Sequence, residues 1–246
     1  MPSPLLFLLV FIVAVLYSSA GFGGASGYLL SMSFFGIPAN VMSSTALVMN
    51  IFVSTISFIN YFRAGHFRPK LLIPFLITSI PAAFLGGTFK LTQQTYTSLL
   101  YAVLTYLALR MTLLPVLSDK SDWTPRPVPL WAALTSGAVI GLLSGMIGIG
   151  GGIFLSPLII LAGWGSSKQA AASAGAFIAI NSLSGLIGRV SNGTFSFGEF
   201  GVPLLFIGVI GALIGSRLGA VKLSSANVRR ALGVILILAV GTYWFK

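Results

Sequence analysis

The chain contains no cysteine, only one histidine and only three acidic residues among 246. Without cysteine it has no disulfide, no catalytic thiol and no thiolate metal site. Asp119 and Asp122 lie in a polar stretch and Glu199 lies at a turn, so no apolar run carries in its interior a carboxylate that could relay protons across a membrane. Charged residues make up 7% of the chain, against about 25% in an average soluble domain. The composition therefore predicts an all-α polytopic membrane protein.

Positive charge is the one kind of charge that is plentiful, with 14 Lys and Arg residues and a net charge of +11. These residues are scattered between apolar runs, which is the pattern of a chain orienting itself in a lipid bilayer rather than of a nucleic-acid-binding patch. No positive charge precedes the first apolar run, so we expect that run to be retained rather than cleaved as a signal peptide. The expected location is a cell membrane, with the lipid bilayer as partner and no nucleic acid.

Apolar runs of about 20 residues are long enough to cross a bilayer. Six runs reach that length: Val41–Phe62, Leu71–Phe89, Tyr96–Leu117, Gln169–Val190, Glu199–Gly219 and Val228–Phe245. Two further regions, Leu5–Phe35 and Leu130–Ala162, are apolar but interrupted by glycine clusters. Each of these two regions is either one kinked helix or two half-length helices joined by a glycine turn.

The two interrupted regions belong to an internal repeat. A polar linker at 118–128 separates residues 1–117 from residues 129–246. The two segments share three features in the same order, namely a Gly-x-Gly-Gly cluster, a small-residue start of the next run, and an asparagine within that run. The matched residues are Gly21 with Gly148, Asn40–Ala46 with Lys168–Ala174, and Asn50 with Asn181. We predict two repeats, each a broken re-entrant-type helical hairpin plus three transmembrane helices.

The distribution of positive charge favours hairpins over kinked full-length helices. If each glycine-broken region enters and leaves on one side, 11 Lys and Arg residues lie inside, and only Lys90, Arg189 and Lys246 lie outside. Eight full crossings would divide the charges more evenly, against the positive-inside tendency. The hairpin arrangement predicts inverted-topology repeats, both termini on the outer side, and glycine turns that reach the middle of the membrane from opposite faces.

The glycine turns are the best candidates for a binding site. Each should open a short helix, at about Ala25 and at about Ile153, and a helix N-terminus offers unpaired N–H groups and a partial positive charge. Such groups bind oxyanions, and glycine lets a ligand approach the backbone closely. The alternative is close helix packing through small residues. The candidate substrate-binding residues here are Gly23, Gly24, Ala25, Ser26, Gly150, Gly151 and Gly152.

The runs that follow the glycine turns add amide and hydroxyl groups. We expect Asn50, Ser54, Asn181 and Ser184 to complete the hydrogen bonds to the anion. The alternative for the serines is ordinary hydrogen bonding between membrane helices. Arg63 and Arg189 follow the asparagines and could attract anions into a vestibule. For Arg63, a role in fixing topology is the alternative.

Gly24-Ala25-Ser26-Gly27 also fits the G-x-S-G pattern of intramembrane serine proteases. Such a serine needs a histidine within the membrane as its base, and the lone His66 stands at a charged turn beyond the next run. No phosphate-binding loop, metal cluster or cofactor fingerprint is present. We therefore expect no enzyme activity, no cofactor and no metal.

The combined pattern resembles the sulfite exporter TauE/SafE family of membrane permeases. The resemblance rests on the broken glycine segments, the turns Gly36-Ile37-Pro38 and Gly163-Trp164-Gly165, the helix start Lys168–Ala174, and the asparagine-bearing run. In the first half, Asn40-Val41-Met42 replaces the Lys-Gln-Ala start. The resemblance implies a bacterial or archaeal inner-membrane carrier of small sulfur-containing anions, such as sulfite or sulfoacetate. An anion channel and a non-transporting scaffold remain the alternatives, and a homodimer remains open.

Overall fold

The computed structural model describes residues 3–113 and 125–221, and within these residues it contains helices and no strand. The first half comprises α1 (Pro4–Ser19), α2 (Ala25–Phe34), α3 (Ala39–Arg63), α4 (Pro69–Thr88) and α5 (Gln93–Leu113). The second half comprises α6 (Leu130–Ile147), α7 (Gly152–Leu161), α8 (Ser167–Ser191) and α9 (Gly201–Val221).

These helices confirm the all-α membrane protein. Five of them, α3, α4, α6, α8 and α9, are long and apolar enough to cross a membrane. The expected runs at Val41–Phe62, Leu71–Phe89, Gln169–Val190 and Glu199–Gly219 coincide with α3, α4, α8 and α9. The run Tyr96–Leu117 coincides with α5 as far as Leu113, and Val228–Phe245 lies outside the described residues. Large apolar side chains face outward, with Phe206 66% and Ile77 58% exposed, as expected for surfaces that contact lipid.

Both glycine clusters interrupt a helix, but the resulting arms are unequal. The second arms, α2 and α7, each have 10 residues, whereas α1 has 16 and α6 has 18. The prediction of two half-length helices is therefore wrong for α6, whose length is enough to cross a membrane. The helix continues until Gly148, whose φ of +92° is a conformation that favours glycine.

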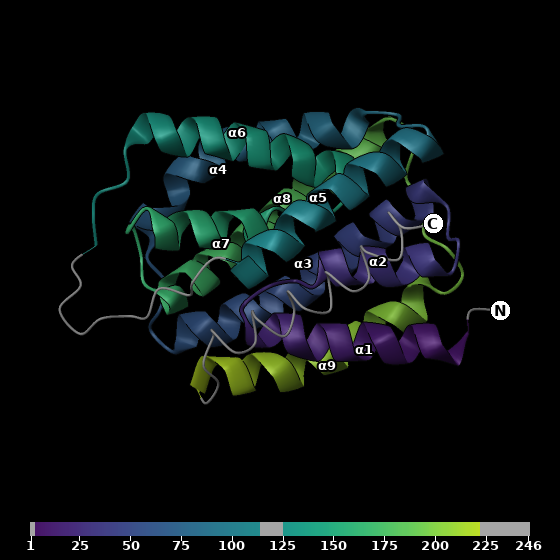
Figure 1. Ribbon diagram of the computed structural model, residues 1–246, viewed down its shortest axis with the longest axis horizontal. Helices are drawn as coiled ribbons and strands as arrows, with labels where there is room; N and C mark the ends of the chain where they lie inside the picture. The colour runs from purple at the N-terminus through teal and green to yellow at the C-terminus, as the bar shows by residue number, and fades with distance from the viewer. Residues whose placement is uncertain (1–2, 114–124, 222–246) are drawn as a thin grey trace.

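The halves interlock through their first and fourth helices. In Figure 1, α1 begins near the N-terminal mark at the right and α6 begins at the left, so these two helices run in opposite directions. Helix α1 packs along α9, and α6 packs along α4. The α6 contact is close enough that a Cβ on Gly141 would lie 2.4 Å from the Ser79 carbonyl oxygen. Likewise, a Cβ on Gly215 of α9 would lie 2.1 Å from the Val15 carbonyl oxygen.

Helices α3 and α8 pack against each other at the centre of the molecule. Each has 25 residues, and much of each is buried. Because their lengths are equal, positions can be matched by counting from the first residue of each helix. Asn50 in α3 then matches Ile178 in α8, and Ser54 matches Ser182. At this matched position, near the middle of both helices, α3 carries the amide of Asn50 and α8 carries the aliphatic side chain of Ile178.

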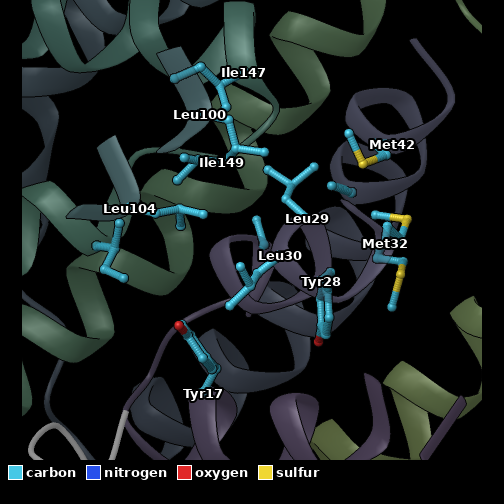
Figure 2. Close-up of a cluster of buried hydrophobic side chains, with 14 of the residues drawn as sticks. Tyr17, Tyr28, Leu29, Leu30, Met32, Met42, Leu100, Leu104, Ile147 and Ile149 are labelled. Carbon is cyan, nitrogen blue, oxygen red and sulfur yellow. The ribbon is translucent and has the colours of Figure 1, made fainter. Parts of the chain in front are cut away.

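Apolar side chains hold the two glycine breaks in place. The largest buried cluster joins α1, α2 and α5 with residues of the second break. Figure 2 shows Leu29 and Leu30 of α2 in this cluster together with Leu100 of α5 and Ile149 of the break. Burying apolar surface at about 25 cal/mol per Å² stabilises such contacts in water, but between membrane helices close packing carries more of the stability.

Candidate functional site

The two glycine breaks come together around Asn50 and Ile178. A Cβ added to Gly23 in the first break would lie 2.6 Å from Asn50 Oδ1 and 3.0 Å from Ile178 Cγ2. A Cβ added to Gly150 in the second break would lie 2.6 Å from Ile178 Cγ2 and 2.9 Å from Asn50 Nδ2. Breaks from opposite halves of the chain thus approach the same two side chains, and any larger residue at either glycine would collide with them.

Backbone N–H groups at both breaks lack partners. Within the described residues, no hydrogen bond is formed by the amides of the six predicted backbone donors, Gly23, Gly24, Ala25, Gly150, Gly151 and Gly152. Three of these groups precede or open α2, and three precede or open α7. An unpaired buried N–H costs about as much as a lost hydrogen bond, so these donors favour an acceptor from outside the protein. Their position at two helix N-termini favours a negatively charged one.

The space at the breaks is small in this conformation. A cavity of about 10 Å³ is lined by Gly23, Gly24, Ala25 and Ser26 together with Ile149, Ile153 and Ile178. That volume is close to the minimum for a single water molecule. An anion the size of sulfite does not fit in this space.

Asn50 is the polar side chain best placed to complete the site. It is fully buried, its Nδ2 lies 3.5 Å from the Gly148 carbonyl oxygen, and its Oδ1 has no hydrogen-bond partner among the described residues. Asn181, the other predicted asparagine, donates to the Phe177 carbonyl within its own helix at 2.9 Å, and its Oδ1 is also unpartnered. Only Asn50 is therefore shown to approach both breaks.

The predicted serines lie in three different settings. Ser26 donates to the Tyr17 hydroxyl at 2.9 Å and lines the small cavity. Ser54 donates to the Asn50 carbonyl at 2.5 Å, within α3. Ser184 donates to the Ile80 carbonyl of α4 at 2.7 Å, which links two helices and leaves its hydroxyl hydrogen engaged away from the breaks. Of the predicted serines, Ser26 is the one that lines the candidate site.

Two further residues, Ile178 and Ser182, lie at the candidate site although they were not predicted from the sequence. Ile178 contacts both breaks, and Ser182 Oγ would lie 2.9 Å from a Cβ on Gly150. Ser182 is buried and its hydroxyl has no partner in the described chain. Matching α3 to α8 by position would have found both, because they are the counterparts of Asn50 and Ser54. Aligning the two asparagines instead directed attention to Asn181 and Ser184.

Side chains from two other helices, α8 and α5, hold the C-terminal end of α6, immediately before the second break. Arg189 Nη2 donates to the carbonyl oxygens of Gly145 at 3.1 Å and Met146 at 2.8 Å. The Tyr96 hydroxyl donates to the Ile147 carbonyl at 2.8 Å. The last carbonyls of a helix have no partner within it, and here α8 and α5 supply the donors. This arrangement fixes where α6 stops and the break begins.

The two predicted vestibule arginines differ in their surroundings. Arg63 ends α3 as an exposed residue and lines none of the described cavities. Arg189 is only 4% exposed and lines a cavity of about 210 Å³ beside the second break. Of the two, only Arg189 is placed where a vestibule residue would act.

Comparison with known proteins gives this arrangement a family. The sequence pattern of the family described as "Sulfite exporter TauE/SafE" matches residues 6–243, nearly the whole chain. The chain belongs to the sulfite exporter TauE/SafE family. No solved structure matches the chain significantly.

Two relatives of this TauE/SafE protein are named as probable membrane transporters. A probable membrane transporter protein of Sinorhizobium fredii is 35% identical over 235 residues, covering 93% of each chain. A probable membrane transporter protein of Methanocaldococcus jannaschii is 28% identical over 255 residues, covering 95% of this chain and 92% of the relative. The protein is therefore a membrane transporter and not an enzyme, and the G-x-S-G serine is part of a transporter's glycine break.

Proposed function

We propose that the protein is a secondary transporter of small sulfur-containing anions, sulfite or an organosulfonate such as sulfoacetate, which bind between the two glycine breaks. The observation that carries the proposal is the set of six unpartnered backbone N–H groups at the adjoining breaks. Several donors converging from two helix ends suit a group with several oxygens, such as a sulfonate or sulfite. The family description supplies the sulfur-containing class.

The binding mode assigns a role to each predicted residue. Gly23, Gly24 and Ala25 donate from one break, and Gly150, Gly151 and Gly152 donate from the other. Asn50 offers its amide, with Ser26 beside it. Ser54, Asn181 and Ser184 then serve mainly to hold α3, α8 and α4 around the site. The anion is bound without any buried cation at the breaks themselves.

Inverted repeats would let this site open to each side in turn. Two observations support halves of opposite orientation, residues 1–117 and 129–246. Helices α1 and α6 run in opposite directions, and the first helix of each half packs along the fourth helix of the other half, α1 along α9 and α6 along α4. Because the conformation described here leaves about 10 Å³ at the breaks, transport requires one half to move against the other. We place the protein in the cell inner membrane with both termini outside, and a homodimer is compatible with its apolar outer surface.

Two measurements test the proposed function. Ligand binding to purified protein should raise its melting temperature in sulfite, sulfoacetate or another sulfonate, and not in chloride at the same ionic strength. Reconstituted protein should then show saturable counterflow of the anion that stabilises it. A channel would conduct without counterflow, and a scaffold would do neither.

The variant Gly23→Ala tests whether the anion binds at the glycine breaks. Its Cβ would lie 2.6 Å from Asn50 Oδ1, in the space assigned to the anion, so binding and counterflow should both be lost. Gly175→Ala in α8 is the matched control, because its Cβ would come no closer than 3.2 Å to any neighbour. Normal binding by folded Gly23→Ala protein would contradict the assignment of the site to the breaks.

A further inference from the structure

A second cavity, of about 210 Å³, lies beside the second glycine break and is more positively charged than the first. Arg189 and Lys90 both line it, together with Asn40, Ser43, Tyr96 and Thr194. No acidic residue lines it, and Glu199, the acidic residue within the described part of the chain, is exposed elsewhere in the loop before α9. The cavity therefore combines two cations with polar groups and no internal counter-charge.

The guanidinium of Arg189 has unused hydrogen-bonding capacity. Its Nη2 donates to two carbonyl oxygens of α6, but its Nε has no partner among the described residues. The residue is only 4% exposed. A buried cation with an unpaired donor and no carboxylate is costly, and an entering oxyanion would satisfy both the charge and the donor.

The N-terminus of α3 adds to this positive environment. The helix begins at Ala39, whose N–H has no acceptor within the helix and donates to Gln93 Oε1 at 2.8 Å. Asn40 and Ser43 on the first turns of α3 line the cavity. The positive end of the helix dipole thus lies at the cavity wall, where it favours negative charge.

The same arginine connects the cavity with the candidate site at the breaks. Gly145 and Met146, whose carbonyls Arg189 holds, are in the last turn of α6, and the break begins at Gly148. The Tyr96 hydroxyl, which also belongs to a residue that lines the cavity, donates to the Ile147 carbonyl. An anion that draws the Arg189 guanidinium toward itself would weaken its hydrogen bonds to the last turn of α6, where the second break starts.

We propose that this cavity is an entry site for the transported anion, with Lys90 and the Nε of Arg189 as its anion-binding groups and with Arg189 linking occupancy to release of the second break. The proposal rests on the proposed function. It makes Lys90 and Arg189 substrate-contacting residues on one face of the protein, ahead of the site at the breaks.

At the equivalent position, the first half of the chain has no cation like Arg189. Tyr61 occupies in α3 the position that Arg189 occupies in α8, and its hydroxyl donates to the Ser19 carbonyl at the end of α1 at 3.0 Å. A neutral phenol holds the end of α1 where a cation holds the end of α6. The entry site is consequently one-sided, and the two faces of the transporter should differ in apparent affinity for the anion.

Asn40→Asp tests the entry site with little risk to folding. The substitution keeps the size of the side chain and puts a carboxylate in the first turn of a helix, where negative charge is favourable. In the cavity that charge repels an anion, and at contact distances we expect the KM for uptake from this face to rise about tenfold or more, with the KM from the other face unchanged. Gln94→Glu is the control, since Gln94 is exposed near the start of α5 and does not line the cavity.

The KM values are measured by counterflow in proteoliposomes of known orientation, with the sulfonate or sulfite added to one side at a time. Lys90→Gln should raise the KM from the same face, and high salt should reduce its difference from wild type. Equal KM changes on both faces, or a rise as large for Gln94→Glu as for Asn40→Asp, would overturn the entry site. If the wild type shows counterflow and Asn40→Asp has the same KM values as the wild type, the entry site is wrong but the proposed function stands. If the wild type itself shows no counterflow, the proposed function is wrong as well.

Discussion

Asn50 and Ile178 occupy matching positions in α3 and α8, and each contacts the glycine breaks of both halves. A Cβ on Gly23 or on Gly150 would collide with both side chains. At this matched position the α3 side chain is polar and the α8 side chain is apolar. Of this matched pair, only Asn50 carries a side chain that can hydrogen-bond, so under the proposed function the residue at this position should influence which charge the site accepts.

Asn50→Asp should exclude anions in a pH-dependent way. The substitution keeps the shape of the side chain but introduces a negative charge beside the proposed site, which should weaken binding about tenfold or more at neutral pH. As the pH falls and the carboxyl group takes up a proton, the charge disappears and binding should recover. Methanesulfonate is a suitable ligand because its own charge does not change over this range.

The measurement is the rise in melting temperature with ligand as a function of pH, for wild type and variant in parallel. Asn60→Asp is a control, because Asn60 is on the same helix but donates to Ser216 near the end of α9. Equal affinity of Asn50→Asp and wild type at neutral pH would place the anion elsewhere.

Much of the fold could be predicted from the sequence because the information is local. Apolar runs bounded by polar turns located α3, α4, α8 and α9, and the glycines located both breaks, with α7 starting at Gly152 rather than Ile153. Glycines with positive φ, such as Gly24 and Gly151, end or begin helices wherever they occur, whatever packs around them. The length of α6 was misjudged because the position of the glycines was taken to imply equal arms.

The details of the site could not be predicted, because they depend on which way each side chain faces. Ser184 lies on the asparagine-bearing helix as expected, yet its hydroxyl donates to Ile80 of α4. Ile178 contacts both breaks, and an isoleucine in an apolar run gives no sign of such a role. Tyr96 reaches the end of α6 from α5, a contact between parts of the chain that no local pattern relates.

Close packing of α4 against α6 should make Gly141 sensitive to a single added methyl group. In Gly141→Ala the Cβ would lie 2.4 Å from the Ser79 carbonyl oxygen, so the two helices must move apart. Overpacking of this kind typically costs about 1–3 kcal/mol of unfolding free energy. Thermal unfolding in detergent measures the loss, and Val139→Ala is the control, because Val139 is 60% exposed on the same helix. Equal stability of the two variants would mean that the helices are not in such close contact.

The only histidine in the chain reports on the turn between α3 and α4. Partial burial lowers the pKa of His66 below its ordinary value of 6.5, and the positive charge of Lys168 at the start of α8 lowers it further. The folded protein therefore disfavours the imidazolium, while the unfolded chain takes up the proton near pH 6.5. His66 should reduce the stability of the fold as the pH falls from 6.5 toward the lower pKa, and should have no such effect above 6.5.

The NMR titration of a single imidazole measures this pKa directly in uncharged detergent. Lys168→Gln removes the nearby positive charge, so the midpoint should move up toward 6.5. Lys90→Gln, on a different turn, should leave the midpoint where it is. A midpoint at or above 6.5 in wild type would show that the α3–α4 turn does not lie beside the start of α8.

Because the natural chain has no cysteine, single cysteines can report the orientation of each half without background. Arg63 and Ser191 are the last residues of α3 and α8, and both are exposed. Inverted halves would put these matched helix ends on opposite sides of the membrane, with Ser191 outside and the α3 end inside. In intact cells, a membrane-impermeant maleimide should label Ser191→Cys, and should label Ala64→Cys, next to Arg63, only after the membrane is permeabilised. Labelling of both positions in intact cells would mean that the halves share one orientation, and the breaks could then not reach the middle of the membrane from opposite faces.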